Sequence, residues 1–128
     1  MNILKIATLN LNGIYTPNMI AMLHAILRSH VLDILFLQEI THPNFGNLPG
    51  YTTYTNVGTT MRGTAFVTRN DLQVTNITKL PTGRGIPVEC DGITLLNYMN
   101  LPGQQNRRRE KPFLTLTLYT LCTMPQNT

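Results

Sequence analysis

The chain has 128 residues, of which 42% are hydrophobic and 12% are charged. This length predicts a single domain, and the composition excludes a disordered tail, a collagen-like repeat and a coiled coil. The formal net charge of +4 fits a polyanionic partner, although much of the excess lies in the run Arg107 to Arg109, which is more typical of a solvated loop or a first helical turn than of a phosphate contact.

The N-terminal third of the chain predicts a strand, a helix and a second strand. Ile3 to Leu11 is mostly apolar with polar residues at its carboxyl end, as in a strand covered on both faces. The segment from Thr16 to Ser29 opens with a favourable Thr-Pro helix start and repeats apolar residues at helical spacing. Asp33 to Glu39 is a short apolar run that ends in polar residues. This order predicts a parallel strand pair joined by a right-handed crossover.

The middle of the chain is rich in Thr, Tyr, Gly and Asn and predicts a β-meander. Its candidate strands run from Tyr51 to Asn56 and from Gly63 to Arg69, and a turn-rich segment separates them. Leu72 to Leu80 is a further candidate strand.

A hairpin is predicted around Asp91-Gly92, a dipeptide typical of two-residue turns. Val88 to Cys90 precedes the dipeptide and Ile93 to Met99 follows it. We expect these two segments to pair as antiparallel strands.

The segment beyond Gly103 is ambiguous on pattern alone. Leu114, Leu116 and Leu118 alternate with threonines, as in a strand, whereas the preceding Arg/Glu/Lys-Pro run is typical of a helix start. Both alternatives stay open at this point.

The sequence gives no sign of secretion or of a membrane segment. Cys90 and Cys122 show neither CxxC spacing nor a His/Cys cluster, so neither a disulfide framework nor a zinc site is indicated. The N-terminus has no apolar signal-peptide core, and the longest apolar stretch, Val31 to Leu37, is far short of the roughly 20 residues that span a membrane. We therefore expect a nuclear or cytoplasmic protein that is not secreted.

Polar side chains gather at the ends of the first two predicted strands. Asn10 and Asn12 end the first strand, and Gln38-Glu39 ends the second. A parallel pair places these ends side by side, in the crevice where α/β sheets bind ligands. Amide and carboxylate oxygens suit a hard cation such as Mg²⁺, which can neutralise charge on a phosphate. A carboxylate at a strand end is more often only solvated or salt-bridged, so spacing alone leaves the function open.

These strand ends resemble the endonuclease/exonuclease/phosphatase superfamily, whose first strand reads like Ile6 to Gly13 and whose second ends like Gln38-Glu39. The resemblance narrows to the endonucleases of LINE-type retrotransposons through Thr41-His42, Arg62 to Ala65, Leu80 to Ile86 and Asn106 to Arg108. It implies an α/β fold of four layers, with two mixed sheets face to face and outer helices, as in exonuclease III. Residues 1–128 would form the N-terminal half, a single partial domain.

The same resemblance assigns roles to individual residues. Glu39 is expected to bind the divalent metal, implied to be Mg²⁺, and Asn10 to help hold the metal and the scissile phosphate, so that both are catalytic. Asn12 and Arg107 are the expected phosphate contacts, and DNA is the implied partner. The histidines are expected to be surface or packing residues and not bases: His24, His30 and His42.

One departure from the family pattern lies in Asn97 to Gly103, where the family typically reads Asn-Val-Tyr-Ala-Pro-Ser-Gly. Counted without a gap, Met99 occupies the tyrosine position, and in a strand Tyr98 would point to the opposite face. A thioether cannot donate a hydrogen bond to a phosphate as a phenol can. We therefore expect weaker phosphate positioning.

A second departure is that these 128 residues contain neither the Gly-Asp-Phe-Asn nor the later Ser-Asp-His segment of the family. We expect an inactive N-terminal fragment whose strands make up one sheet with an apolar face left uncovered. Such a sheet would need the missing C-terminal half as a partner, or would self-associate. The resemblance also predicts a helix that opens at Arg107 to Glu110 and runs through Phe113 to Leu121.

The function implied is nicking of DNA by a domain of a retrotransposon reverse transcriptase polyprotein. A non-enzymatic transposon remnant, without a role or binding nucleic acid weakly through Arg107 to Arg109, is the main alternative. A relative acting on phosphoinositides or RNA tails is a third, since Asn10 and Glu39 alone do not separate these substrates. The retroelement-like middle segments favour the nuclease.

Overall fold

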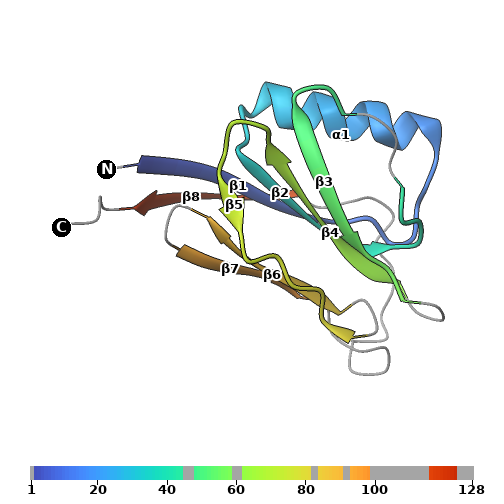
Figure 1. Cartoon of the computed structure of the whole chain (residues 1–128). Helices are drawn as coiled ribbons and strands as arrows, with labels where there is room; N and C mark the ends of the chain where they lie inside the picture. The colour runs from blue at the N-terminus through green and yellow to red at the C-terminus, as the bar shows by residue number, and fades with distance from the viewer. Residues whose placement is uncertain are drawn as a thin grey trace.

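The computed structural model describes residues 2–44, 48–58, 62–81, 84–90, 93–98 and 116–123. Its elements, in chain order, are β1 (Asn2–Asn10), α1 (Pro17–Ser29), β2 (Ile34–Ile40), β3 (Tyr51–Asn56), β4 (Gly63–Arg69), β5 (Val74–Thr75), β6 (Gly85–Cys90), β7 (Ile93–Tyr98) and β8 (Leu116–Thr123). A five-stranded sheet has the order β3-β4-β2-β1-β8, and a three-stranded sheet has the order β5-β6-β7. Figure 1 shows α1 covering one face of the larger sheet and the smaller sheet lying against the other.

The predicted strand–helix–strand unit is confirmed. β1 and β2 are parallel neighbours, with Ile6 opposite Ile34 and Asn10 opposite Gln38. The helix starts at Pro17 because the Thr16 side chain accepts a hydrogen bond from the Met19 amide at 3.2 Å, which caps the first turn. One face of the helix is buried against the larger sheet through Met19, Leu23 and Leu27. The apolar spacing therefore sets which side of the sheet the helix covers.

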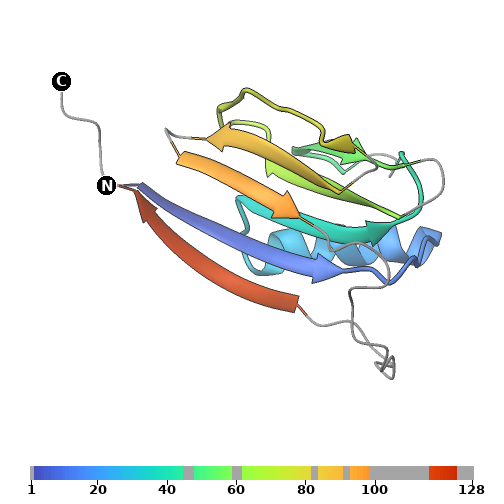
Figure 2. The same ribbon diagram turned by 90° about the horizontal axis from the view of Figure 1, so that it is seen from below.

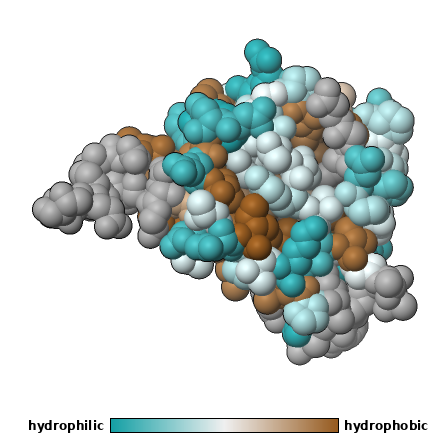
Figure 3. Space-filling view, in the orientation of Figure 1, coloured by the Kyte–Doolittle hydropathy of each residue, from teal (hydrophilic) through white to brown (hydrophobic). Residues whose placement is uncertain are grey.

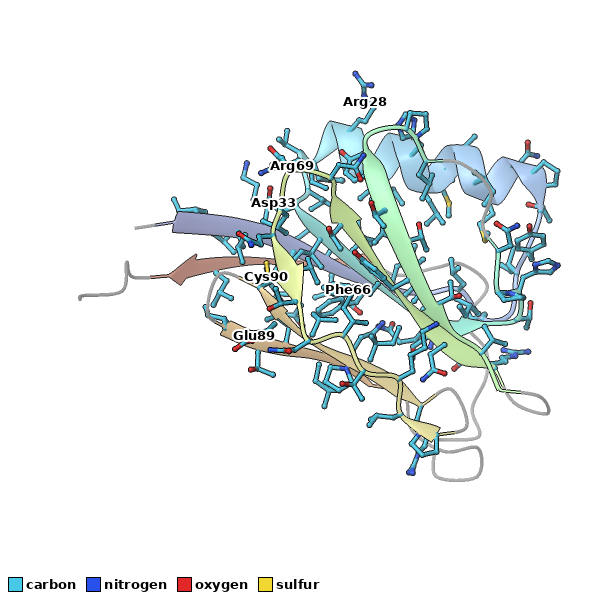
Figure 4. The ribbon with its side chains drawn as sticks, in the orientation of Figure 1. Arg28, Asp33, Phe66, Arg69, Glu89 and Cys90 are labelled. Carbon is cyan, nitrogen blue, oxygen red and sulfur yellow. The ribbon has the colours of Figure 1, made fainter. Side chains whose placement is uncertain are left out.

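A second core lies between the two sheets, so the expectation of a single sheet with an uncovered face is wrong. Alternate residues of β6 are apolar and buried against the larger sheet. Phe66 of β4 is fully buried there, with its ring centroid 5.0 Å from that of Phe36. Figure 4 shows Phe66 between the sheets, with Cys90 entering from β6. The core residues are Leu4, Ile6, Ile34, Phe66, Ile86, Val88 and Cys90.

The middle strands form where predicted, but their order is not that of a simple meander. β3 and β4 pair antiparallel, and so do β6 and β7 of the predicted hairpin. β4 lies between β2 and β3. Of the candidate strand Leu72 to Leu80, only Val74–Thr75 is a strand, and it pairs with β6 in the smaller sheet.

The helix expected from Phe113 to Leu121 is wrong over its described part, because Leu116–Thr123 is a strand. β8 pairs antiparallel with β1, with Tyr119 opposite Ile6. Alternating leucines and threonines suit a strand. β8 is the edge strand of the larger sheet, so the ladder to β1 pairs the main-chain groups along one side of it. The run Arg107 to Glu110 lies outside the described residues.

Asp33 joins three strands at the end of the larger sheet opposite the expected site. Its buried carboxylate accepts a hydrogen bond from the Lys5 amide at 2.8 Å and forms an ion pair with Arg69, and Figure 4 shows these two side chains pointing toward one another. Arg69 also binds Asp71, and this hydrogen bond lowers the pKa of the exposed Asp71 carboxyl. The cluster holds β1, β2 and β4 in register.

The smaller sheet leaves part of the larger one uncovered. Figure 2 shows β1 and β8 extending beyond β7. A cavity of about 470 Å³ opens there, with a lining of Ile6, Thr8, Phe36, Gln38, Leu96, Asn97, Tyr119, Thr120 and Leu121. Leu96 and Tyr119 are more than half exposed, at 52% and 56%. On the face seen in Figure 3, hydrophobic side chains also reach the surface near the centre, among hydrophilic ones. Within the described ranges, no helix is long and apolar enough to cross a membrane.

Asn97 is a buried polar side chain that links the two sheets. It is 2% exposed, and its Nδ2 donates to the carbonyl oxygens of Leu37 at 3.0 Å and Ala65 at 2.6 Å. These bonds run from β7 of the smaller sheet to β2 and β4 of the larger one. A buried amide with satisfied partners stabilises one relative placement of the sheets.

Replacing Asn97 with Ala should lower the free energy of unfolding by about 3 kcal/mol, because buried carbonyl oxygens lose their donor. The measurement is the urea midpoint of each variant. The matched control is Thr94→Ala on the same strand, where the side chain is exposed and the loss should stay within about 0.5 kcal/mol. Equal midpoints for the two variants would contradict a linking role for Asn97.

Candidate functional site

The carboxyl ends of β1 and β2 bring Asn10 and Glu39 into direct contact. Asn10 is the last residue of β1, and its Nδ2 donates to Glu39 Oε2 at 3.0 Å. The Glu39 side chain is 14% exposed, so its carboxylate is partly shielded but still reachable from solvent. The structure therefore brings together the two side chains that the sequence placed at neighbouring strand ends.

A β-bulge aims Glu39 at Asn10. Leu35 and Leu37 face the helix, and simple alternation would send residue 39 to the same side. The register with β4 shifts between Gln38 and Ile40, and Ile40 takes the helix-side position instead. Glu39 has a φ of 56°, in the left-handed region that costs a non-glycine residue roughly 1 kcal/mol. Strain at this position is offset by the contacts of the carboxylate.

A tight turn after β1 orients the side chain of Asn10. The Asn12 amide donates to Asn10 Oδ1 at 2.8 Å, which orients the Asn10 side chain. Gly13 has a φ of 80°, and its amide donates to the Glu39 carbonyl at 2.8 Å. Asn12 itself is exposed beside the pair. Its main chain thus contributes to the site, while a phosphate contact of its side chain stays a prediction.

Arg62, directly before β4, is a member of the site to which the sequence had assigned no role. Its Nη1 lies 2.7 Å from Glu39 Oε1, and the guanidinium packs so closely on Gly13 that a Cβ there would lie 2.8 Å from Arg62 Cζ. The Arg62 side chain is 48% exposed, so this ion pair is screened by solvent. The only signal in the sequence was the Arg62 to Ala65 segment that the resemblance had matched.

Gln38 holds the backbone next to Glu39. Its Nε2 donates to Thr8 Oγ1 at 2.7 Å and to Asn97 Oδ1 at 2.9 Å. Asn97 also binds the carbonyl of Leu37. A buried network therefore fixes the end of β2 from which the Glu39 side chain projects, as supporting shells do for functional side chains.

Several predicted positions stay untested by these contacts. Arg107 and Met99 lie outside the described residues, and of Tyr98 only the strand backbone is described. Among the side chains that are described, no group of three or more His, Cys, Asp or Glu could hold a metal ion. His24 lies 3.3 Å from the carbonyl of Pro49, and His42 stacks on Tyr15, in keeping with packing histidines.

The polar groups in contact with one another at the strand ends are the Glu39 carboxylate, the Asn10 amide and the Arg62 guanidinium. Mg²⁺ in proteins is usually held through one or two carboxylates and retains several waters, and Glu39 is a ligand of that kind. The amide of Asn10 turns its nitrogen to Glu39 and its oxygen to the Asn12 amide, so its oxygen would join such a shell only after the bond to Glu39 is exchanged. A guanidinium beside them suits a phosphate oxygen.

Comparisons with solved structures identify the architecture. An AP endonuclease from Archaeoglobus fulgidus matches with a TM-score of 0.60 and 24% identity, over 75% of this chain and 40% of that one. The endonuclease domain of TRAS1, a telomere-specific non-LTR retrotransposon, matches with a TM-score of 0.60 and 18% identity, over 81% and 49%. The AP endonuclease LMAP from Leishmania major matches with a TM-score of 0.56 and 18% identity, over 76% and 40%.

The present chain spans less than half the length of these structures, between 40% and 49%. The identities are low, so the likeness is one of fold. No protein-family model and no curated protein matches the sequence.

The left-handed backbone conformation at Glu39 should affect the free energy of unfolding of variants at this position. The free energy of unfolding of Glu39→Gly should exceed that of Glu39→Ala by about 1 kcal/mol, which the urea midpoints of the two variants measure. Both variants lose the carboxylate, but only glycine adopts this φ without strain. In an ordinary strand the order would be reversed. A more stable alanine variant would therefore show that the bulge is absent.

Proposed function

We propose that this chain, which has the fold of the endonuclease/exonuclease/phosphatase superfamily, is the N-terminal part of a metal-dependent DNA endonuclease domain that hydrolyses phosphodiester bonds. The observation that carries the proposal is the contact between Asn10 and Glu39 at the carboxyl ends of two parallel strands. It places an amide and a carboxylate where α/β sheets bind ligands. The fold alone would not single out this chemistry.

Glu39 and Asn10 would hold the divalent metal, which we take to be Mg²⁺. When bound, the metal supplies charge neutralisation on the phosphate oxygens and on the leaving group. Asn10 is held for this task by the Asn12 amide, and Glu39 by the bulge and by the Gln38 network. A metal at Glu39 would replace the hydrogen bond from Asn10 Nδ2 and the ion pair with Arg62. Asn12 and Arg107 are the proposed further phosphate contacts.

Arg62 would exchange partners when a cation binds. Its guanidinium neutralises Glu39 Oε1 at 2.7 Å, so a divalent cation approaching the same carboxylate meets a positive charge. Because Arg62 is half exposed, it can swing away without leaving a buried charge. The freed guanidinium then suits a substrate phosphate oxygen.

The substrate class that we propose is DNA, cut by a domain of a retrotransposon reverse transcriptase polyprotein in the nucleus or cytoplasm. The LINE-type motifs support this context, and so does the likeness to the TRAS1 endonuclease domain. Residues 1–128 contain neither the Gly-Asp-Phe-Asn nor the Ser-Asp-His segment, so we propose that they are inactive alone. The exposed inner side of β8 at Tyr119, beside Leu96 of β7, is where the remaining half would pack, and without it self-association is expected.

The alternative is a non-enzymatic remnant that binds nucleic acid weakly. Two sequence features favour it: Met99 stands at the tyrosine position of the family segment, and a basic run lies at Arg107 to Arg109. Such a remnant would bind through charge alone, and its affinity would fall steeply with salt.

Binding of Mn²⁺, measured by calorimetry as a stand-in for Mg²⁺, tests the proposed metal site. Glu39→Gln should weaken Mn²⁺ binding at least roughly tenfold, because an amide replaces the carboxylate at the carboxyl end of β2. The control is Glu89→Gln, a carboxylate on β6 that binds Asn76 instead. Equal effects of the two substitutions would overturn the proposal.

Nicking of supercoiled plasmid tests whether residues 1–128 contain a complete catalytic site. We expect none from the folded chain in Mg²⁺. Nicking that EDTA and Glu39→Gln both abolish would show that 128 residues suffice, and would exclude the remnant.

Replacing Arg62 with Ala should tighten Mn²⁺ binding roughly fivefold, since about 1 kcal/mol of competing attraction to Glu39 is lost. Arg28→Ala, an exposed position on α1, is the control for the change in net charge. Weaker Mn²⁺ binding in Arg62→Ala would show that the guanidinium assists the metal site and does not compete with it.

A further inference from the structure

Two aromatic rings stack on the surface beside the candidate site. The rings of Tyr15 and His42 are nearly parallel, with centroids 4.1 Å apart and an interplanar angle of 7°. Neither belongs to a core, because Tyr15 is 39% exposed and His42 is exposed as well. Ile14 next to them is also exposed, at 44%. The loops after β1 and β2 thus present an aromatic and apolar surface to solvent.

This pair is held rigidly by its own loops. The Tyr15 hydroxyl donates to the carbonyl of Asn44 at 2.8 Å, which ties the loop after β1 to the loop after β2. Thr55 of β3 donates to the carbonyl of Pro43 at 2.9 Å, directly after His42. A platform that is already ordered loses little conformational entropy when a ligand stacks on it.

The two loops that carry the stack also bond to each other beside Glu39. The Gly13 amide donates to the Glu39 carbonyl at 2.8 Å, and Thr41 Oγ1 donates to the Gly13 carbonyl at 3.4 Å. Tyr15 follows Gly13 by two residues, and His42 follows Thr41 directly. The platform therefore continues the same two loops that frame the carboxylate.

We propose that the Tyr15–His42 stack binds an unpaired nucleobase of a DNA strand whose phosphate lies at Asn10 and Glu39. An exposed, rigid aromatic face is what proteins use to bind the bases of single-stranded nucleic acid, and any base can stack on it. Arg62, packed on Gly13, would supply the cation for the adjoining phosphate. This subsite rests on the proposed nuclease function, because it extends the path of the same strand.

A base-binding role and a purely structural role of the stack predict different effects on ligand binding. If the stack only tied two loops together, its loss would weaken every ligand of the site alike. If it binds a base, its loss should matter only for a strand that carries a base at that position.

The experiment uses the whole chain and a single-stranded DNA of about ten nucleotides that contains 2-aminopurine, together with the same strand made abasic at that position. Tyr15→Leu and His42→Leu should each weaken binding of the base-containing strand roughly tenfold. They should also remove the quenching of 2-aminopurine and leave the affinity for the abasic strand unchanged. Tyr15→Phe, which keeps the ring and loses the hydroxyl bond to Asn44, should keep the quenching and most of the affinity for the base-containing strand. Tyr119→Leu, an exposed tyrosine on β8, should have no effect.

Equal losses for both strands would overturn the platform, and so would unchanged binding in the leucine variants. Mn²⁺ binding measured on the same variants separates this result from the proposed function. If Tyr15→Leu and His42→Leu keep their affinity for Mn²⁺ and bind the base-containing strand as before, only the base-binding role of the stack is contradicted. If the chain binds no Mn²⁺ at Glu39, the proposed nuclease function is contradicted.

Discussion

The side-chain amide of Asn97 holds the two sheets together at the point where the candidate site begins. It donates to carbonyl oxygens of β2 and β4, and its own oxygen accepts from Gln38. Because Gln38 directly precedes Glu39, the placement of the smaller sheet and the direction of the carboxylate depend on one buried network. A hydrophobic residue at this position would bury similar area but would leave the end of β2 without its polar partners.

The fold was predictable where the sequence pattern is strong and local. The first strand, the helix from Thr16 to Ser29 and the second strand agree with the structure to within a residue or two at their ends, because apolar period and a Thr-Pro cap determine them. The two-sheet architecture implied by the family resemblance is confirmed, but the division of these strands between both sheets was missed, since alternation marks a buried face without saying which sheet covers it. The family resemblance predicts a helix through Leu121, whereas the Leu-Thr alternation predicts the strand that forms at Leu116–Thr123.

The candidate site was predictable only in part. Asn10 and Glu39 were expected to meet because parallel strands align their carboxyl ends, and they do. The bulge that aims Glu39 has no periodic signal, and the ion pair with Arg62 joins residues far apart in the sequence. Such long-range polar contacts follow from the tertiary fold, so single-sequence reasoning could name Arg62 only as part of a motif.

The proposed function requires a cation at Asn10 and Glu39. Paramagnetic broadening by Mn²⁺ of the amide resonances of the isotope-labelled chain locates that cation most directly. We predict that resonances from Asn10 to Gly13 and around Glu39 broaden first, including the Asn10 side-chain amide. Broadening centred instead on the exposed carboxylate of Asp71, or spread evenly over the surface, would contradict a metal site at the strand ends.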